Sequence, residues 1–196
     1  MDTPNETTKT DQELVLATLL NKHAFSEIVD KYESPIRRYV RRLGCRDDSD
    51  VDDVLQNIFI KVFTNLNEYD QDLKFSSWLY RIAHNETISF FRKKNVRPSV
   101  LTLSTEDTDR FFELLADDED PVEIKYLENE ASIVRDVLVG LDLKYREALI
   151  LRFLEEKSYT EISDILKIPE GTVATLINRG KKILKVVLTD KDMKSL

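Results

Sequence analysis

The hydrophobic residues in the first half of the chain recur every three or four positions, a spacing that places them on one face of an α-helix. They predict four amphipathic helices, at residues 11–22, 25–43, 50–66 and 76–94. Gly44 follows the second pattern and is expected to end that helix, as glycine often does. Pro35 lies inside the same pattern, so we expect a kink or a break there. Ser76 or Ser77 is the expected N-cap of the fourth helix.

The helical pattern stops between residues 96 and 121, where a proline lies near each end and acidic runs surround one short apolar patch. Beyond it, the periodicity predicts helices at residues 122–139, 143–155, 159–166 and 170–188. Four Gly and five Pro in 196 residues are few for a protein rich in β-turns. We therefore predict an all-α fold with two small helical domains, residues 11–97 and 122–188, joined by an acidic linker at residues 98–121.

The segment from Ser158 to Leu184 is typical of two short helices joined by a tight turn, because Ile168 and Pro169 separate two apolar patterns. Such a corner usually holds its second helix toward the major groove of DNA. Between residues 167 and 185, five basic residues accompany one acid, on a chain whose net charge is -8. This local charge suits phosphate binding. The alternative is a helical hairpin with a solvated basic face.

Charge is distributed unevenly along the whole chain. Residues 36–46 hold five arginines and no acid, whereas residues 47–73 hold eight acids and one base. Residues 74–97 are again basic, and residues 98–130 hold eleven acids and two bases. Segregation on this scale indicates separate partners for separate surfaces, with chance clustering on a solvated surface as the alternative for any single block.

The chain offers little chemistry for catalysis. His23 and His84 are far apart in sequence, and no glycine-rich phosphate-binding loop is present, so we expect neither an enzyme nor a cofactor or metal site. The single Cys45 excludes an internal disulfide, which fits a reducing, cytoplasmic setting. We expect no signal peptide, no C-terminal sensor domain and no membrane insertion, since no apolar run approaches the roughly 20 residues of a membrane span.

Two further segments carry candidate nucleic-acid chemistry. The third predicted helix has a polar side that includes Asp53, Gln56 and Asn57. The segment LKFSSWLYRIAHNETISFFRKK, residues 73–94, combines aromatic residues with a basic helix end. Aromatic side chains among cations suit single-stranded nucleic acid, where bases stack while cations hold phosphates. The alternatives are a core role for Trp78 and Tyr80, and basic residues that only favour a helix C-terminus.

Taken in order, these segments resemble a bacterial RNA polymerase sigma factor of the extracytoplasmic-function (ECF) group. The resemblance covers about residues 22–97, as sigma region 2, and 124–188, as sigma region 4. DDVLQNIFIKVF is similar to the region 2.2 helix, FSSWLYRIAHN to regions 2.3 and 2.4, and SYTEISDILKIPEGTV to the region 4 helix-turn-helix. Three motifs in this order and spacing are far more specific than any one of them.

The resemblance implies how region 2 works. Asp53, Gln56 and Asn57 are the expected contacts to core RNA polymerase, on the coiled coil of its largest subunit, and the polymerase flap region is a further implied partner. In the family, the loop after region 2.2, here residues 69–77, holds a flipped base of the single-stranded -10 element. The residues expected at this element are Phe75, Trp78 and Asn85 around the base, and Arg81, Arg92, Lys93 and Lys94 on the phosphates.

The resemblance also implies that the helix from Glu170 reads the duplex -35 element. The expected contacts are Glu170, Thr172, Ala174 and Thr175 at base edges, and Arg179, Lys181 and Lys182 at phosphates. The chain departs from the family at Ala174, Leu176 and Lys167, where the family usually has a basic residue, an arginine and a turn glycine. Fewer phosphate contacts predict weaker -35 binding with a shallower salt dependence.

The sequence therefore predicts a sigma factor that binds core polymerase and directs promoter recognition, DNA opening and transcription initiation. The acidic linker is expected to thread the basic RNA channel of the polymerase, as in the family. An anti-sigma factor is a further partner that the resemblance allows. The alternatives are a helix-turn-helix transcriptional regulator, which does not need the region 2 segments, and a sigma-like decoy that binds a partner without initiating transcription.

Overall fold

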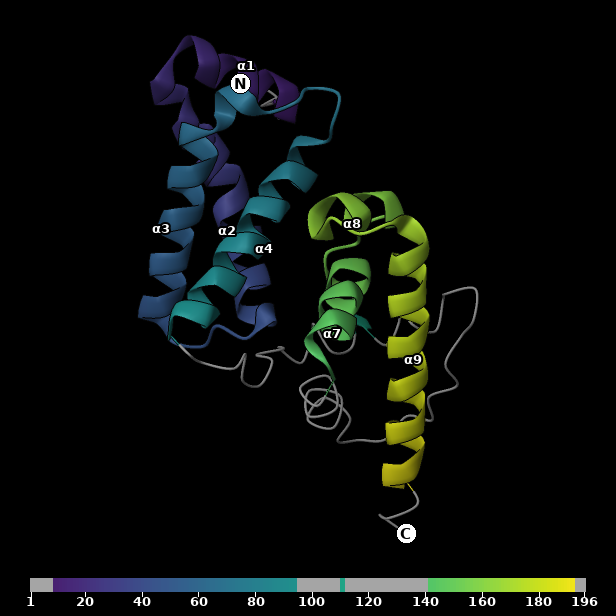
Figure 1. Ribbon diagram of the computed structural model, residues 1–196. Coiled ribbons are helices and arrows are strands. Elements are labelled where there is room, and N and C mark those ends of the chain that lie inside the picture. The colour runs from purple at the N-terminus through teal and green to yellow at the C-terminus, as the bar shows by residue number, and fades with distance from the viewer. Residues whose placement is uncertain (1–8, 95–109, 112–140, 193–196) are drawn as a thin grey trace, which may run out of the picture.

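The computed structural model describes residues 9–94, 110–111 and 141–192, and the regular elements of this part are all helices (Figure 1). The longer helices are α1 (Asp11–Leu20), α2 (Phe25–Leu43), α3 (Asp48–Thr64), α4 (Phe75–Lys94), α7 (Leu143–Leu149), α8 (Tyr159–Leu166) and α9 (Glu170–Asp192). The all-α prediction is confirmed. Among these helices, none is long and apolar enough to cross a membrane.

Helix α2 has the predicted bounds and the predicted end. Gly44 has φ 118°, a left-handed conformation that glycine adopts without strain, and its N–H bonds to the carbonyls of Val40 and Arg41. The helix continues through Pro35, so the expected break is absent. Ile28 and Ile36, on either side of the proline, are both 0% exposed, and this packing holds the helix together across the missing backbone hydrogen bond.

Helix α4 begins one residue earlier than predicted, and neither serine caps it. Its first turn closes with a hydrogen bond of 3.2 Å from the Trp78 N–H to the Lys74 carbonyl. Ser77 is inside the helix and buried. Phe75 is 2% exposed and packs against Tyr69, and this burial sets where the helix starts.

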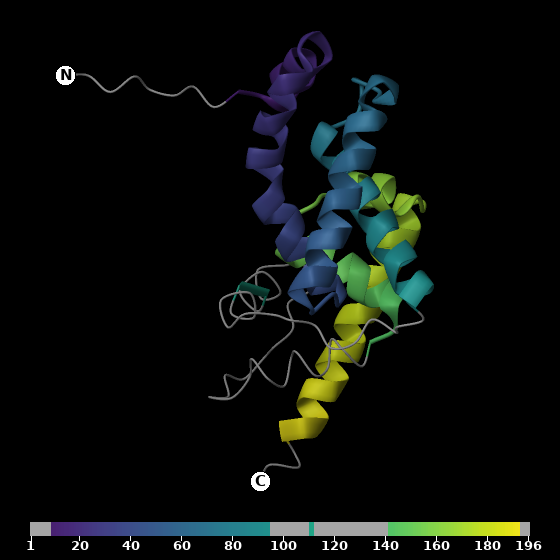
Figure 2. The ribbon, with the colours of Figure 1, turned by 90° about the vertical axis from the view of Figure 1, so that its left-hand side faces the viewer.

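The first domain consists of α2, α3 and α4 side by side, with α1 across one end (Figures 1 and 2). Residues at helical spacing fill the space between the helices. Among the most deeply buried are Ile28, Ile36, Leu43, Val54, Ile58, Val62, Leu79 and Ala83, each at most 1% exposed. Cys45 is also in this core, 2% exposed, and burial raises the pKa of its thiol to about 11.

The second domain contains α7, α8 and α9. The helix predicted at residues 143–155 is present, but its second half, Ile150–Leu154, is a π-helical turn. Ser158 and Glu161 form a reciprocal capping box at the start of α8. Helix α9 crosses close to α7 at Gly180, because a Cβ there would lie 2.9 Å from Leu149 Cδ1.

Most of the expected linker, and the helix expected at residues 122–139, lie outside the described residues. Two linker residues are described, and both contact the second domain. Phe111 is 0% exposed and packs edge-on against Phe153, with ring centroids 5.5 Å apart. Arg110 forms an ion pair with Glu156. This part of the expected linker is therefore attached to the second domain.

The two domains are in contact, since α8 packs along α4 (Figure 1). Beside this contact, His84 Nε2 lies 4.0 Å from Glu147 Oε1, and the Tyr39 hydroxyl lies 3.4 Å from His84 Nδ1. Burial lowers the pKa of His84 to about 4, and the positive charge of Arg92 acts in the same direction. Burial raises the pKa of Glu147 to about 7, against the opposing effect of Arg146.

The first prediction concerns the turn of the helix-turn-helix. Lys167 has φ 56° and ψ 46°, a left-handed conformation that costs an L-residue about 1 kcal/mol. Lys167→Gly should therefore raise the free energy of unfolding in urea by about 0.5–1 kcal/mol. Lys182→Gly, inside α9, is the matched control and should lower it by about 1 kcal/mol. Equal losses in both variants would contradict the strain at Lys167.

The second prediction concerns pH. Because folding raises the pKa of Glu147 above its ordinary value of 4.5, its contribution to stability is fully present below pH 4.5 and is lost as the pH rises through 7. Glu147→Gln removes this ionisation, so its stability relative to wild type should grow by about 2 kcal/mol between pH 5 and pH 8.

Urea unfolding at the two pH values measures this difference. The exposed Glu68→Gln is the matched control and should show no such pH dependence. The pH dependence of the wild-type stability alone would not isolate the effect of Glu147. His84 has a lowered pKa, so its contribution to stability is lost as the pH falls from 6.5 through 4, which is the opposite direction. A pH-independent effect of Glu147→Gln would refute the raised pKa.

Candidate nucleic-acid and polymerase interfaces

Helix α3 has one uncovered polar face. Asp53, Gln56 and Asn57 follow at i, i+3 and i+4, and all three are exposed, while Val54 and Ile58 on the other side are buried. The Asn57 side chain donates to the Asp53 carbonyl at 2.8 Å, which fixes its position on the helix. The structure therefore brings the three predicted polymerase contacts together on one surface.

Sequence reasoning missed an apolar extension of this face. Ile60 is seven residues after Asp53, two helical turns further along the same side, and its side chain is 52% exposed. Phe63 lies next to it along the helix and is 37% exposed. The sequence contained a signal for this extension. Ile60, at i+7 from Asp53, is an apolar residue on what is otherwise the polar side of the helix.

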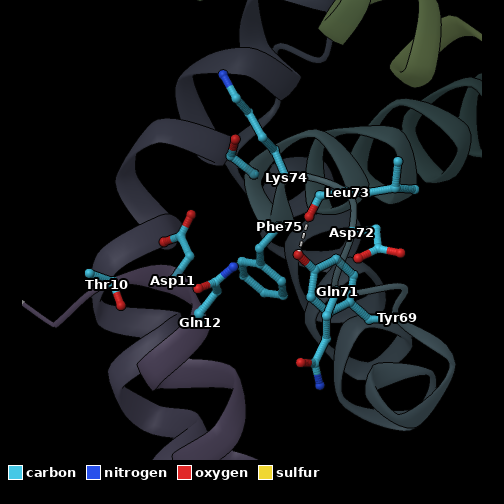
Figure 3. A pocket seen from close by; sticks show the side chains of 10 residues that line it. Thr10, Asp11, Gln12, Tyr69, Gln71, Asp72, Leu73, Lys74 and Phe75 are labelled. Atoms are coloured by element: carbon cyan, nitrogen blue, oxygen red, sulfur yellow. Dashed lines mark hydrogen bonds between the residues drawn. The ribbon is translucent and has the colours of Figure 1, made fainter.

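A pocket lies between the loop after α3 and the start of α1 (Figure 3). It has a volume of about 290 Å³ and is lined by residues 69 and 71–76 of the loop and by Thr10, Asp11 and Gln12. Asp11 accepts hydrogen bonds of 2.7 Å from Lys31 and Tyr32, so it is held in place. Gln12, Gln71 and Asp72 are exposed, and their polar groups can therefore meet a ligand.

Aromatic packing fixes the shape of this pocket. The Tyr69 hydroxyl donates to the Leu73 carbonyl and so closes the loop on itself. Burial raises the pKa of Tyr69, which keeps the phenol neutral and able to donate. Phe75 stands edge-on to Tyr69, with ring centroids 5.4 Å apart, and forms part of the pocket wall.

Two residues predicted at this pocket do not line it. Trp78 is 7% exposed and lies behind the wall, with its ring centroid 5.3 Å from Tyr69 and 5.7 Å from Phe75. Asn85 is exposed on α4, ten residues after Phe75 and therefore about 15 Å further along the helix. The prediction that Trp78 shapes this pocket directly is corrected, because the tryptophan is in the core that supports the loop.

Asn85 instead belongs to a stripe along α4. Arg81, Asn85 and Arg92 follow at i, i+4 and i+11, which places them on one face of the helix. Arg92 and Lys93 are exposed, and Arg81 is partly buried. Lys94 forms an ion pair with Asp50 and lies 5.0 Å from the centre of the Phe90 ring, so its charge is already partly compensated.

Helix α9 presents a continuous polar stripe. Thr172, Thr175, Arg179 and Lys182 follow at i, i+3, i+7 and i+10, and all are exposed. Glu170 at the start of the helix is also exposed, whereas Ala174 is partly buried. Val173, Ile177 and Leu184 on the opposite side are at most 1% exposed and hold the helix on the domain. The polar residues therefore lie near the N-terminus of the helix and the basic ones further along.

Lys181 is the exception among the predicted phosphate contacts. It is 5% exposed, because its position, four residues after Ile177 and three before Leu184, is on the core side of α9. Lys181 therefore does not lie on the exposed basic face in this structure, and its contact with phosphate stays a prediction. The hydrophobic periodicity around it already indicated this orientation.

The described residues contain no group of three or more His, Cys, Asp or Glu side chains that could hold a metal ion. The surfaces above are built from amides, carboxylates, hydroxyls and basic groups, and the polar loop pocket is hollowed between two of the elements described.

Comparisons with known proteins agree on one family. The family model described as Sigma-70 region 2 matches residues 28–97, and the one described as Sigma-70, region 4 matches residues 132–184. The ECF RNA polymerase sigma factor SigW of Bacillus subtilis is 34% identical over 175 residues, 87% of this chain and 91% of that protein. The ECF RNA polymerase sigma-E factor of Haemophilus influenzae is 31% identical over 179 residues, 90% of this chain and 94% of that protein.

A solved structure shares the fold. The structure of CnrH in complex with the cytosolic domain of CnrY matches with a TM-score of 0.65 at 23% identity, covering 92% of this chain and 97% of that chain. The resemblance found in the sequence is confirmed: this chain belongs to the ECF family of RNA polymerase sigma factors.

Proposed function

We propose that this sigma factor binds core RNA polymerase through the uncovered face of α3 and promoter DNA through two separate surfaces. Unpaired -10 DNA binds at the loop pocket and the α4 stripe, and duplex -35 DNA binds at α9. The observation that carries the proposal is the α9 stripe, whose exposed threonines precede exposed basic residues on one side of a helix anchored by the other. This order suits base contacts near the helix N-terminus and phosphate contacts beyond it.

The α3 face suits a protein partner. Interface centres are depleted in charged residues and commonly combine apolar contacts with a few hydrogen bonds. Gln56, Asn57 and Ile60 supply this combination, with Asp53 at the edge. We assign this face to the coiled coil of the polymerase largest subunit. We assign binding of the flap region to the second domain.

The loop pocket suits a flipped base. Taking a base out of its stack costs a few kcal/mol, which hydrogen bonds to the base edge and stacking can offset. The amides of Gln12 and Gln71 and the carboxylate of Asp72 can pair with the donors and acceptors of a base edge. Arg81 and Arg92 along α4 then hold the phosphates of the adjoining strand, and Asn85 lies between them.

The -35 contact is expected to be weak. Ala174 and Leu176 are partly buried and uncharged, and Lys181 faces the core, so Arg179 and Lys182 supply the basic contacts on the exposed stripe. Each phosphate contact contributes about 0.9 to the slope of log binding constant against log salt concentration. The second domain therefore depends on polymerase to hold it at its DNA.

The third prediction tests the function itself. Purified core polymerase with this protein should give run-off transcripts from a subset of a promoter library, and core polymerase alone should not. A chain that binds polymerase without producing transcripts would be the decoy, and a chain that binds DNA but not polymerase would be an ordinary regulator. Either outcome would reject the proposal.

A substitution on α3 tests whether this helix binds the polymerase. Ile60→Asp places a charge in the centre of the proposed contact and should weaken binding to a fragment of the largest-subunit coiled coil at least tenfold, about 1.4 kcal/mol. Val186→Asp is the matched control, because Val186 is 59% exposed but belongs to the other domain. Equal effects of the two changes would remove Ile60 from the polymerase interface.

The fourth prediction compares two basic residues on α9. Arg179→Ala should reduce the slope of log binding constant against log salt concentration by about one, measured for the polymerase holoenzyme on promoter DNA. Lys181→Met should leave the slope unchanged, because this side chain is buried against the domain. A change of slope with Lys181→Met would show that this lysine reaches DNA after all.

A further inference from the structure

We propose that Asn178 on α9, a residue outside the contacts expected from the sequence, reads an adenine of the -35 element, and that Gly171 lets the helix come close enough to DNA for this contact. This role rests on the proposed binding of α9 to duplex -35 DNA. It adds to that function the residue that selects one base and the kind of base that is selected.

The exposed side of α9 carries three rows of residues, each with a spacing of seven positions, which is nearly two turns of an α-helix. The contacts already assigned to DNA occupy two of these rows: Thr172 with Arg179, and Thr175 with Lys182. The third row contains Gly171 and Asn178, and both are exposed. Gly171 is four residues before Thr175 and Asn178 is three after it, so both lie next to this threonine on the helix surface.

Asn178 is turned away from the core of the second domain. It is one position after Ile177 and five after Val173, which rotates it by about 100° and about 140° from these two fully buried residues. Within the part of the chain that the structure describes, its side-chain amide has no hydrogen-bond partner. Asparagine is a poor helix former, so the fold itself gives no reason for this residue in the middle of α9.

The amide of an asparagine matches the major-groove edge of adenine. Its oxygen accepts from the N6 amino group and its nitrogen donates to N7, a pair of contacts that no other base offers in this arrangement. Arg179, the next residue, and Lys182, four positions later, are exposed and basic. Contacts of these two residues with phosphates can hold the helix in register while the amide of Asn178 reads the base.

Thr175 favours an A·T pair at the same place. Its hydroxyl donates to the Gly171 carbonyl at 2.8 Å, so this group is already used within the helix. The group left for DNA is its methyl, which fits the C5 methyl of thymine. Thr175 precedes Asn178 by about 4.5 Å along the helix axis, close enough for the two side chains to meet the same base pair or adjacent ones.

The two glycines of α9 have different reasons to be there. At Gly180 a Cβ would lie 2.9 Å from Leu149 Cδ1, so close packing against α7 explains this glycine. At Gly171 a Cβ would meet nothing within 4 Å, and the backbone does not have the positive φ that favours glycine. Glycine destabilises a helix relative to alanine. Neither packing nor conformation therefore accounts for Gly171, whereas close approach of a ligand to the backbone does.

The bare backbone at Gly171 lies on the row of Asn178, two turns before it. The asparagine side chain is short, so its amide reaches a base edge only when the helix lies deep in the groove. The absence of a side chain at Gly171 removes the group that would hold this row away from DNA. Gly171 is thus a positioning residue for the contact of Asn178 with the base.

The fifth prediction uses polymerase holoenzyme and a duplex promoter library in which the -35 region is randomised. Wild type should enrich adenine over every other base at one position by at least about fivefold. Asn178→Ala should reduce this enrichment to about twofold or less and leave the other positions unchanged. Asn178→Asp has the same shape but only accepts hydrogen bonds, so it should shift the preference at that position to cytosine, whose N4 amino group donates.

Val186→Ala is the matched control, because Val186 is exposed on the same helix about two turns beyond Asn178, and it should leave every preference unchanged. Asn178→Ala should unfold at no lower urea concentration than wild type, which separates loss of the contact from loss of folding. An adenine preference that survives in Asn178→Ala would overturn the assignment and leave the proposed function in place. If wild type selects no -35 sequence at all, the proposed -35 contact is rejected together with this inference.

Gly171→Ala tests the close approach with two measurements that should move in opposite directions. The midpoint of urea unfolding should rise, because alanine is the better helix former. The affinity of the holoenzyme for the promoter DNA that wild type selects should fall at least fivefold. Gly180→Ala is the comparison on the same helix, and its unfolding midpoint should fall because of the contact with Leu149. Unchanged promoter affinity in Gly171→Ala, or a lower unfolding midpoint, would overturn the role of Gly171.

Discussion

Helix α4 is packed by two separate sets of helices, and the location of the proposed binding surfaces depends on this double burial. The first domain contacts it through α2 and α3, and the second through α8. Leu79, Ala83 and Thr87 in its middle are 0% exposed. A narrow stripe of Arg81, Asn85 and Arg92 remains accessible. The same helix therefore forms part of the core of one domain, the contact to the other and a candidate DNA surface.

The two sides of α4 make different kinds of contact. Against α2 and α3 the packing is apolar and close, which suits a domain that stays folded. Against the second domain, the contacts include ionisable and hydroxyl groups: Arg42, Tyr80, His84, Glu147 and Glu155.

Sequence alone predicted the helices well, because a stripe of apolar residues is a local signal. The bounds of α2 and α8 agree with the expected ones, and Gly44 ends its helix as expected. The start of α4 was wrong by one residue, because the packing of Phe75 on Tyr69 brings together residues six apart through a loop. The continuity of α2 through Pro35 likewise depends on the burial of residues before and after the proline in the tertiary structure. A local sequence pattern does not contain this information.

The candidate surfaces could be predicted where they lie on one helix, as on α3 and α9. The pocket could be predicted only in part, since its second wall comes from Asp11 and Gln12, which are about sixty residues away from the loop. Lys181 lies within a basic run of the sequence, yet its side chain is 5% exposed on the core side of α9. Charge along the sequence therefore does not predict a DNA contact unless the orientation of each residue on its helix is also considered. The contact between the domains left no trace in the sequence pattern, as Arg42 and Glu155 look like ordinary surface charges there.

The buried thiol of Cys45 determines how this chain responds to oxidants. The thiolate is the reactive form of cysteine, and burial, which raises the pKa of this thiol to about 11, keeps it protonated at pH 7. Access is also restricted, since the residue is 2% exposed between the helices of the first domain. Peroxide and disulfides therefore react slowly with this cysteine. The burial and the raised pKa of Cys45 therefore do not favour this thiol as a sensor of oxidants.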